Sequence, residues 1–412
     1  MIATVDIERI AAGGDGVGRM GDGLVVFVPR TAPGDRAEIE LSAKKRNFAR
    51  ARLVGLDSQG PDRVEPQCAH YRTDKCGGCQ LQHLSTAAQL SAKSALVGDA
   101  LRRIGRREVA DPAIVAPSHP WRYRSKISLS VSDRRIGLHV YDRPGQVFDL
   151  EDCLIVRQRI MNLWGELKKR KGFFPAGMSS LVLREDREGG LHVICTGGET
   201  VWNGRDLAEE LRDAGVSVWR KPERGAARVV AGRKTGFPAV AFEQVNLELA
   251  CRVCEEAVEG LGNVAGRVVW DLYAGVGDAS ELLACAGADV WCVDADRSAV
   301  EWGRKRFGGS GTERGSVKRL CGRVEDTLCR LPEADAIVVN PPRAGLHESV
   351  SHDLDGWGAG RSGRRLAYVS CDPATLGRDL RRMPALGIRT VTAYDLFPQT
   401  SHVETLVVLE SG

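Results

Sequence analysis

Cys371 and Glu404 are the residues of this chain whose types and surroundings point most directly to reactive chemistry. Cys371 stands in the sequence SCDP, directly after the apolar segment LAYV. A lone cysteine usually packs as a small hydrophobe, but where a strand meets a helix the helix dipole and free N–H groups favour the thiolate. Glu404 lies in the apolar segment VETLVVL, where an unpaired carboxylate is costly. We interpret Cys371 as a nucleophile and Glu404 as a buried base with a raised pKa, the alternative for Glu404 being a surface glutamate.

A second set of residues is suited to bind a cofactor that carries a nucleoside. The segment DLYAGVGD, residues 271–278, ends a strand with an acid, three residues, Gly, one residue and Gly. This spacing differs from the dinucleotide pattern GxGxxG, and there is no Walker A lysine. Gly275 and Gly277 let the backbone turn tightly against a ligand. Asp271 can hold an ammonium group and Asp294, at the next strand end, two ribose hydroxyls; a glycine-rich packing turn is the alternative.

The elements that must position these residues begin at about residue 240. Segments RVVWDLYAG, DVWCVDAD, EADAIVVNPP and RRLAYVSCDP read as strands that alternate with helices, and two further strands end the chain. This order predicts a parallel sheet with helices on both faces, whose ligands bind beyond the carboxyl ends of the strands. The cofactor segment, Asn340, Cys371 and Glu404 should therefore converge on one cleft of an α/β domain over 239–412. A Gly/Ser/Arg-rich stretch near 308–315 is predicted to be a loop.

Two further domains are predicted before it. Residues 1–57 contain short alternating segments separated by the turns GGDG, GDG and PGD, which indicates a small all-β barrel. Residues 58–238 are β-rich with interspersed helix, including a helical pattern over about 86–107, and are predicted to form an α+β domain. The last two strands of the barrel carry a basic run, which is either a solvated face or a phosphate contact: Lys44, Lys45, Arg46, Arg50 and Arg52.

The bulk composition excludes some classes of protein. The chain has 412 residues, of which 43% are apolar, and a formal net charge of +4, which is compatible with nucleic acid without arguing for it. No run of about 18 apolar residues exists, and the N-terminus lacks the pattern of a signal peptide. We expect a cytoplasmic monomer that does not associate with membranes.

Five motifs together resemble the RNA 5-methyluridine methyltransferase family. They are FEQVN at 242–246, DLYAGVG at 271–277, NPPRAGL at 340–346, SCDPATLGRDL at 370–380 and DLFPQTSHVET at 395–405, in the order of the family. Residues 1–57 similarly resemble the TRAM barrel, an oligonucleotide-binding-like module found on many of these enzymes. The resemblance covers nearly the whole chain and is weakest between about 155 and 235. It implies that residues 239–412 form a Rossmann-like class I methyltransferase domain.

The resemblance implies transfer of a methyl group from S-adenosylmethionine to C5 of a uridine in RNA. Cys371 would add to C6 of the base so that C5 can attack the methyl sulfonium, and Glu404 would then remove the C5 proton. The target is expected to be an unpaired or flipped nucleotide. Family analogy favours 23S ribosomal RNA over transfer RNA. The residues expected to contact the cofactor are Gln244, which would also contact the target, Asp271, Tyr273, Gly275, Asp278, Asp294 and Asn340.

Two positions depart from the family pattern. Asn340 stands where the family most often has Asp, and its amide exchanges one acceptor for a donor. Asp278 replaces the more usual Asn and adds a charge near the cofactor. We interpret both as tuning of the site rather than loss of activity.

Four cysteines are candidates for metal ligation: Cys68, Cys76 and Cys79 in CAHYRTDKCGGCQ, and Cys153 in EDCLIV. Without an export signal, clustered cysteines suggest metal binding or catalysis rather than disulfides. The resemblance implies a [4Fe-4S] cluster, although seven residues separate the first two cysteines where the family commonly has five. Zinc is the alternative for four thiolates. The radical-enzyme spacing CxxxCxxC is absent, so the cluster would be structural or would position RNA.

The remaining cysteines are expected to be packing or near-surface residues. Cys251 and Cys254 have a metal-like spacing, but they lie on an amphipathic helix without a second pair, which favours packing. The others are Cys195, Cys285, Cys292, Cys321 and Cys329.

Two other hypotheses compete with uridine C5 methylation. The first is methylation of another base atom, such as an exocyclic amine, which the sequence Asn340-Pro-Pro suggests and which makes no use of Cys371 or Glu404. The second is an RNA-binding protein with a vestigial catalytic domain, against which the intact loop of Gly275 and Gly277 argues.

Overall fold

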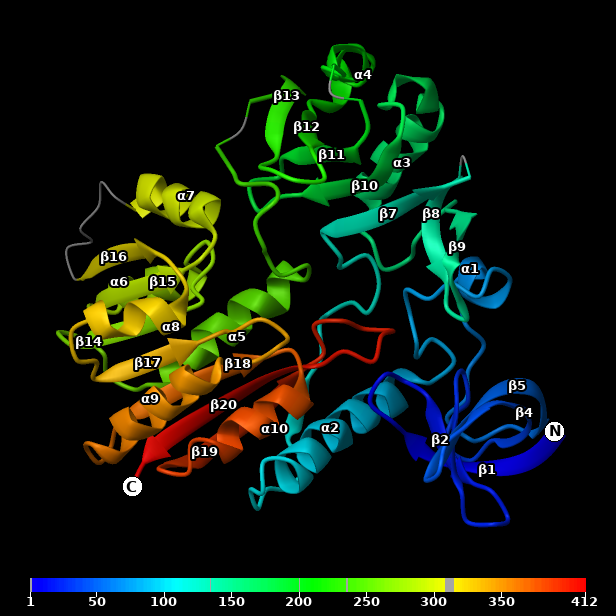
Figure 1. The fold of residues 1–412 in the computed structure, drawn as a ribbon, viewed down its shortest axis with the longest axis horizontal. Helices are drawn as coiled ribbons and strands as arrows, with labels where there is room; N and C mark the ends of the chain where they lie inside the picture. The colour runs from blue at the N-terminus through cyan, green and yellow to red at the C-terminus, as the bar shows by residue number, and fades with distance from the viewer. Residues whose placement is uncertain (1, 134, 200, 235, 308–314) are drawn as a thin grey trace. The chain divides into compact units, whose positions relative to one another are not determined.

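The computed structural model describes residues 2–133, 135–199, 201–234, 236–307 and 315–412. The chain divides into two compact units (Figure 1). The first comprises Met1–Ala92, Ser118–Thr235 and Phe397–Ser401, and the second comprises Lys93–Pro117, Gly236–Leu396 and His402–Gly412. The stretch near 308–315 that was predicted to be a loop lies, except for Gly315, outside the described residues.

The first unit begins with a closed five-stranded barrel, which confirms the predicted small all-β module. Its strands follow the order β1-β2-β3-β5-β4, and alternate residues such as Val5, Ile39 and Val26 fill its core. Of the basic run, Lys44 ends β4, Arg50 and Arg52 lie on β5, and Lys45 and Arg46 lie in the three-residue turn between the two strands. The strands are β1 Ile2–Ile10, β2 Gly16–Arg19, β3 Val25–Val28, β4 Arg36–Lys44 and β5 Phe48–Ser58.

A seven-stranded sheet forms the rest of the first unit, in the order β13-β12-β11-β10-β7-β8-β9. Its strands are β7 Lys126–Ser132, β8 Arg135–Val140, β9 Arg143–Asp149, β10 Met178–Glu185, β11 Leu191–Gly197, β12 Ser217–Lys221 and β13 Arg228–Gly232. The helical segments that accompany it are α1 Ala69–Arg72, α3 Gln158–Lys168, η1 Lys171–Phe173, α4 Arg205–Glu210 and η2 Arg212–Ala214. Helix α2, Thr86–Arg103, runs from the first unit into the second and ends before the predicted residue 107.

The second unit contains an eight-stranded sheet in the order β16-β15-β14-β17-β18-β20-β19-β6. Its first five strands are parallel, as predicted, while β20 is antiparallel to β18 and to β19. Strand β6 comes from far earlier in the chain and pairs with β19 in parallel. The strands are β6 Ala113–Val115, β14 Val268–Leu272, β15 Asp289–Asp294, β16 Ser316–Cys321, β17 Ala336–Val339, β18 Arg365–Ser370, β19 Leu386–Tyr394 and β20 Glu404–Ser411.

Helices pack against this sheet through apolar side chains. Helices α6 and α7 contact β15 and β16, whereas α2, α9 and α10 share a core cluster with the strands through residues such as Leu101, Leu354 and Leu376. A buried ion pair joins Lys93 of α2 to Asp395, with 2.5 Å between Nζ and Oδ1. The helices are α5 Leu247–Gly260, α6 Asp278–Cys285, α7 Arg297–Phe307, α8 Val324–Thr327, η3 Leu328–Arg330, α9 Glu348–Ala359 and α10 Pro373–Arg381. None of the helices that the structure describes has the length and hydropathy needed to cross a membrane.

Candidate active site

The residues predicted to do chemistry line one edge of the second unit's sheet. Asp294 ends β15, Asp271 lies near the end of β14, Asn340 follows β17 and Cys371 follows β18. Glu404 begins β20, and because β20 runs antiparallel to β18, its first residue lies where β18 ends. The predicted residues therefore converge at the carboxyl ends of the strands. Along this edge, Asp294 and the loop after β14 lie on one side of β17, and Cys371 and Glu404 lie on the other side.

The loop after β14 turns sharply before helix α6 begins. Gly275 and Gly277 have φ values of 55° and 95°, in the region that favours glycine, and Gly277 caps α6 at its N-terminus. Tyr273 also has a positive φ, 62°, and is half-buried, with its pKa raised to about 12 chiefly by burial. Asp278 is the first residue of α6, where a carboxylate interacts favourably with the helix dipole.

Asp294 fastens this loop through its carboxylate. Its Oδ2 accepts a hydrogen bond from the backbone N–H of Gly275 at 2.7 Å, and its Oδ1 accepts one from the N–H of Asp296 at 2.7 Å. The side chain remains half-buried. The residue expected to bind ribose hydroxyls thus also holds the loop that would meet the rest of the cofactor.

Asp271 lies beneath the loop rather than on an open surface. Only 2% of the residue is exposed, and Ser280 of α6 donates its hydroxyl to the carboxylate. Burial raises the pKa of Asp271 to about 6, while the Ser280 hydrogen bond and the positive charge of Arg319 lower it. Neither Ser280 nor Arg319 was among the residues predicted for the site. The adjacent Lys318 and Arg319 resemble an exposed strand edge, and only the strand register shows that Arg319 is buried.

Cys371 and Glu404 are neighbours at the other half of the edge. Ser370 pairs with Thr405 in the antiparallel ladder of β18 and β20, so one step further along both strands brings Cys371 beside Glu404. Burial raises the pKa of the Cys371 thiol to about 11, and the carboxylate of Glu404 adds to that rise. The predicted nucleophile and base therefore lie together.

Any stabilisation of the Cys371 thiolate by the helix dipole is outweighed in this structure, because burial and the carboxylate of Glu404 raise the pKa of the thiol. The side chain of Asp372, the N-cap of α10, accepts the N–H groups of Ala374 and Thr375 at 2.9 and 3.0 Å. Asp372 therefore engages these two N–H groups. Partial burial of the Cys371 thiol is the largest cause of its raised pKa.

Glu404 is a buried acid, as predicted, and not a surface glutamate. Only 1% of the residue is exposed, and burial raises its pKa to about 8. Its Oε2 is buried and has no hydrogen-bond partner among the residues that the structure describes. Such an arrangement costs stability, and a carboxyl group with this pKa is suited to accept and release a proton near neutral pH.

Arg343 acts electrostatically on both reactive residues. Its guanidinium lowers the pKa of Cys371 and of Glu404, in each case against the larger effect of burial. The side chain is exposed and donates to Nε2 of His402 at 3.4 Å. Arg343 lies in the motif NPPRAGL but was not among the residues predicted for the site.

Two further predicted residues, Asn340 and Gln244, also belong to the second unit. Asn340 is half-buried, and its backbone N–H donates to the carbonyl of Leu272 at 3.2 Å, which joins the ends of β17 and β14. Gln244 is half-buried in the segment before α5, where Asn246 donates to the carbonyl of Leu396 at 3.3 Å.

The four candidate metal ligands all belong to the first unit. Cys68, Cys76 and Cys79 are buried, and Cys153 is half-buried. Burial raises the pKa values of Cys76 to about 11 and of Cys153 to about 12, and that of Cys79 still further. Neighbouring thiols of the set contribute to each of these rises. The four sulfurs are therefore close enough to interact electrostatically.

Ligation geometry is not formed by these cysteines as they stand. Across the described ranges, no group of three or more His, Cys, Asp or Glu side chains is arranged to hold a metal ion. Two features nevertheless organise the loop. The N–H of Gly78 donates to Sγ of Cys76 at 3.4 Å. Arg30 of the barrel donates to the carbonyls of Tyr71 and, at 3.1 Å, of Cys76, with its guanidinium 4.0 Å from the Tyr71 ring centroid.

The other cysteines mostly follow the prediction. Cys195 and Cys292 are buried, and the near-surface set of residues 285, 321 and 329 is exposed. On α5, Cys254 is half-buried but Cys251 is exposed, so the predicted packing role is wrong for Cys251.

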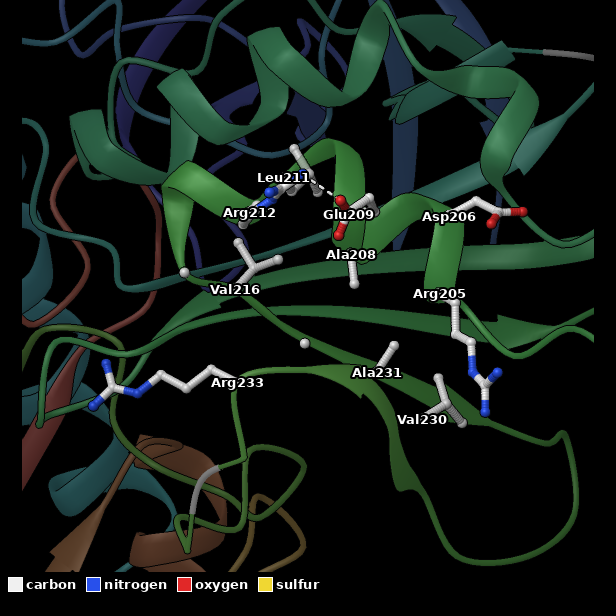
Figure 2. A pocket seen from close by; sticks show the side chains of 12 residues that line it. Arg205, Asp206, Ala208, Glu209, Leu211, Arg212, Val216, Val230, Ala231 and Arg233 are labelled. Carbon is white, nitrogen blue, oxygen red and sulfur yellow. Dashed lines mark hydrogen bonds and ion pairs between the residues drawn. The ribbon is translucent and has the colours of Figure 1, made fainter.

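A separate hollow of about 800 Å³ lies in the first unit between α4 and β13 (Figure 2). Arg205, Glu209 and Arg212 line it from the helical side, where Arg212 pairs with Glu209, and Val230 and Arg233 line it from the strand side. None of the residues predicted to carry chemistry lines this hollow.

Comparisons with protein families match both ends of the chain. Residues 2–54 match the TRAM domain, and residues 312–412 match the family described as tRNA (Uracil-5-)-methyltransferase. Among curated proteins, an RNA methyltransferase of Thermosynechococcus vestitus is 31% identical over 458 residues, covering 100% of this chain and 98% of that protein. The 23S rRNA (uracil(1939)-C(5))-methyltransferase of Azoarcus sp. is 29% identical and covers 99% of both chains.

Among solved structures, the tRNA (uracil-54, C5)-methyltransferase of Pyrococcus abyssi, in complex with S-adenosyl-L-homocysteine, shares the fold. Its TM-score is 0.74 at 22% identity, over 99% of this chain and 100% of that one. The likeness therefore extends over all the domains described above.

Proposed function

The chain belongs to the RNA uracil-C5 methyltransferase family, and from that membership we propose that it methylates C5 of a uridine through a covalent adduct between Cys371 and C6 of the base. One observation carries the covalent part of this proposal. Cys371 and Glu404 lie side by side at the strand edge that also holds the glycine loop. A thiol beside a buried carboxyl, whose Oε2 has no hydrogen-bond partner among the described residues, is suited to addition and elimination.

Each reactive residue performs one half of the chemistry. The Cys371 thiolate adds to C6, and the electron pair of the C5–C6 double bond moves toward C5 and O4. S-adenosylmethionine supplies the methyl group, which C5 takes up as the sulfur–methyl bond breaks. Glu404 then accepts the C5 proton, the double bond re-forms, and the Cys371 sulfur leaves as thiolate.

Arg343 adjusts the charge of this pair. Because its guanidinium lowers the pKa values of both Cys371 and Glu404, it favours the two deprotonated forms that the reaction uses. The carboxylate of Glu404 opposes thiolate formation, so we infer that addition begins while Glu404 is still protonated. Glu404 acts as a base only in the later step, after it has released its own proton.

The cofactor is proposed to bind over the loop after β14. Gly275 and Gly277 allow close backbone approach, Asp294 offers its carboxylate to the ribose, and Asp271 receives the ammonium group from below. By the family pattern, the further contacts are Gln244, Tyr273, Asp278 and Asn340.

An RNA substrate follows from the family and from the TRAM match at residues 2–54. We propose a ribosomal target, because the Azoarcus relative that covers 99% of this chain acts on 23S rRNA; a transfer RNA is the second candidate. The target uridine must leave its stack to reach Cys371, which favours a loop nucleotide. The basic residues Arg50 and Arg52 of β5 already pair with Asp15 and Glu40, so the phosphate contacts of the barrel would come from its neighbouring turn.

A [4Fe-4S] cluster is proposed on Cys68, Cys76, Cys79 and Cys153. The fit rests on the thiols of Cys76, Cys79 and Cys153, whose pKa values are raised by burial and further by neighbouring thiols of the set, and on a backbone N–H that donates to the sulfur of Cys76. Thiols in this setting lose their protons only to a strongly bound cation, which iron or zinc would provide. When bound, the cluster would fix the loop that carries these residues; we assign it no part in methyl transfer.

The central experiment measures methyl transfer from radiolabelled S-adenosylmethionine to ribosomal and transfer RNA, with nucleoside analysis of the product. Wild-type protein should form 5-methyluridine, and C371A should lose activity by about a thousandfold or more. The matched control is C329A, which removes an exposed thiol and should change nothing. Full activity in C371A would instead support methylation of another base atom. Failure of the wild type to bind the cofactor in calorimetry would support a non-catalytic RNA-binding protein.

The cluster is tested separately by anaerobic purification. The expected protein is brown, with broad absorbance near about 400 nm that C79S removes. Colourless protein with stoichiometric zinc would refute the iron–sulfur assignment.

A further inference from the structure

Arg319 lies beneath the loop after β14, in a buried position where a cation is costly. It is only 8% exposed and belongs to β16. The register pairs Asp271 with Cys292 on β15, and Cys292 with Arg319 on β16, so the three residues form one row. The strands that carry them, β14, β15 and β16, are neighbours in the sheet (Figure 1). Residues in register on parallel strands share a face of the sheet. Arg319 is thus placed on the face where Ser280 of α6 meets Asp271.

Two glycines accommodate the guanidinium. A Cβ atom at Gly277, the N-cap of α6, would lie 2.0 Å from Nη2 of Arg319, and one at Gly303 of α7 would lie 2.5 Å from its Cζ. Real Cβ atoms do not approach other atoms so closely. The glycine at position 303 has no positive φ to explain it, since it lies within a helix, where glycine is unfavourable. Arg319 occupies the volume that a side chain at position 303 would need, which explains why this position is glycine.

We propose that Arg319 is a positioning residue of the cofactor site, which supports the turn at Gly277 and balances the negative charge of Asp271 so that this carboxylate can receive the cofactor's ammonium group. This inference rests on the proposed function. Its physical basis is a local excess of acid, because Asp271 is repelled by Asp278 and Asp294, and Arg319 is the cation that opposes them. A cofactor with a positive sulfonium and a positive ammonium group needs those acids ionised.

The charge balance can be read from the groups that face Asp271. Ser280 of α6 donates to it, Cys292 lies beside it on β15, and Asp278 and Asp294 lie near it. Of these groups and Arg319, only the hydrogen bond from Ser280 and the charge of Arg319 favour the ionised form. Removing Arg319 should therefore raise the pKa of Asp271 and shift cofactor binding to higher pH.

The first experiment measures S-adenosylmethionine binding by calorimetry between pH 5.5 and 8.5. R319M should weaken binding by about tenfold at neutral pH and move the binding midpoint up by about one pH unit. R319K keeps the charge and should restore the midpoint while leaving affinity reduced. R389M removes an exposed arginine of β19 in the same sheet and should match the wild type. Unchanged affinity and midpoint in R319M would overturn the proposal.

A second experiment remains informative if R319M does not fold. G303A adds only a methyl group and improves helix propensity, so any loss of cofactor affinity must come from displacing Arg319. We expect G303A to weaken binding by about fivefold in the wild-type background and to have no effect beside R319A. An equal effect of G303A in both backgrounds would refute the contact. If wild-type protein fails to bind the cofactor at all, the proposed function fails instead, and the two outcomes are distinguishable.

Discussion

Cys371 and Glu404 lie one step beyond the Ser370–Thr405 pair, at the point where β18 ends and β20 begins. Their electrostatic coupling follows from this neighbourhood, since the carboxylate of Glu404 raises the pKa of the Cys371 thiol. Two groups that must both lose protons therefore oppose each other's ionisation.

E404Q should trap the covalent intermediate. Glutamine cannot accept the C5 proton, so the adduct between Cys371 and methylated RNA should accumulate, and turnover should fall by about 10² to 10⁴. A band of enzyme joined to RNA on a denaturing gel measures it. The control is E410Q, which changes a paired glutamate at the far end of β20. Multiple turnover by E404Q at the wild-type rate would exclude Glu404 as the base.

The reactivity of Cys371 should respond in opposite directions to its two charged neighbours. E404Q removes a negative charge and should lower the pKa of the thiol below about 11, whereas R343M removes a positive charge and should raise it. At pH 8 iodoacetamide should thus alkylate Cys371 fastest in E404Q and slowest in R343M, as followed by mass spectrometry of its peptide. The reverse order would contradict the electrostatic account of the site.

Glu404 should make the protein less stable as the pH rises. Its folded pKa of about 8 lies above the ordinary 4.5, so the folded state binds the extra proton. Stability from this group is full below pH 4.5 and is lost as the pH rises through 8. Between pH 5 and pH 9, E404Q should gain on the order of 3 kcal/mol relative to the wild type. Differential scanning fluorimetry at both pH values measures this; a pH-independent Tm difference would refute the raised pKa.

The buried pair of Lys93 and Asp395 should be essential for the stability of the second unit. K93M leaves a buried carboxylate without this cation and should cost about 3 to 5 kcal/mol. The double variant K93M/D395L removes both charges and should recover most of that loss. The urea midpoints of the two variants measure these losses of stability. Equal losses in both variants would show that the effect comes from packing rather than from charge.

Arg30 should control the order of the cysteine loop. R30M removes the hydrogen bonds to the carbonyls of Tyr71 and Cys76 and the stacking on Tyr71. We expect faster proteolysis within residues 66–80 and lower metal content after anaerobic purification. R36M, which breaks an exposed pair with Asp6 on the same barrel, is the control. Equal metal content and equal cleavage in R30M and R36M would contradict this role.

Much of the catalytic site could be predicted because strand ends are visible in a sequence. An apolar run followed by DLYAGVG or SCDP marks both the strand and its carboxyl end, and parallel strands bring such ends to one edge. The burial of Glu404 followed in the same way from its apolar neighbours. A local sequence pattern can therefore identify a residue whose role depends on its position at the end of a strand.

Features that depend on register or on competing partners could not be predicted. Arg319 looks exposed beside Lys318 and is recognised as buried only when β16 is paired with β15. The N–H groups of α10 seemed available to Cys371, but the Asp372 side chain takes them. Strand β6 has only three residues, too few for a periodic signal, and joins a sheet whose other strands begin more than a hundred residues later.

The five residues Phe397–Ser401 belong to the first unit although their neighbours on both sides belong to the second. They are held there by Gln80 and Leu81, whose N–H groups donate to the carbonyl of Gln399, and by Gln89 and Tyr123. During synthesis the barrel can close early, but the first unit lacks this segment until residues 397–401 have left the ribosome. Neither unit can be expressed as one uninterrupted fragment, and a ribosome that stalls before residue 397 would release a protein with both halves unfinished.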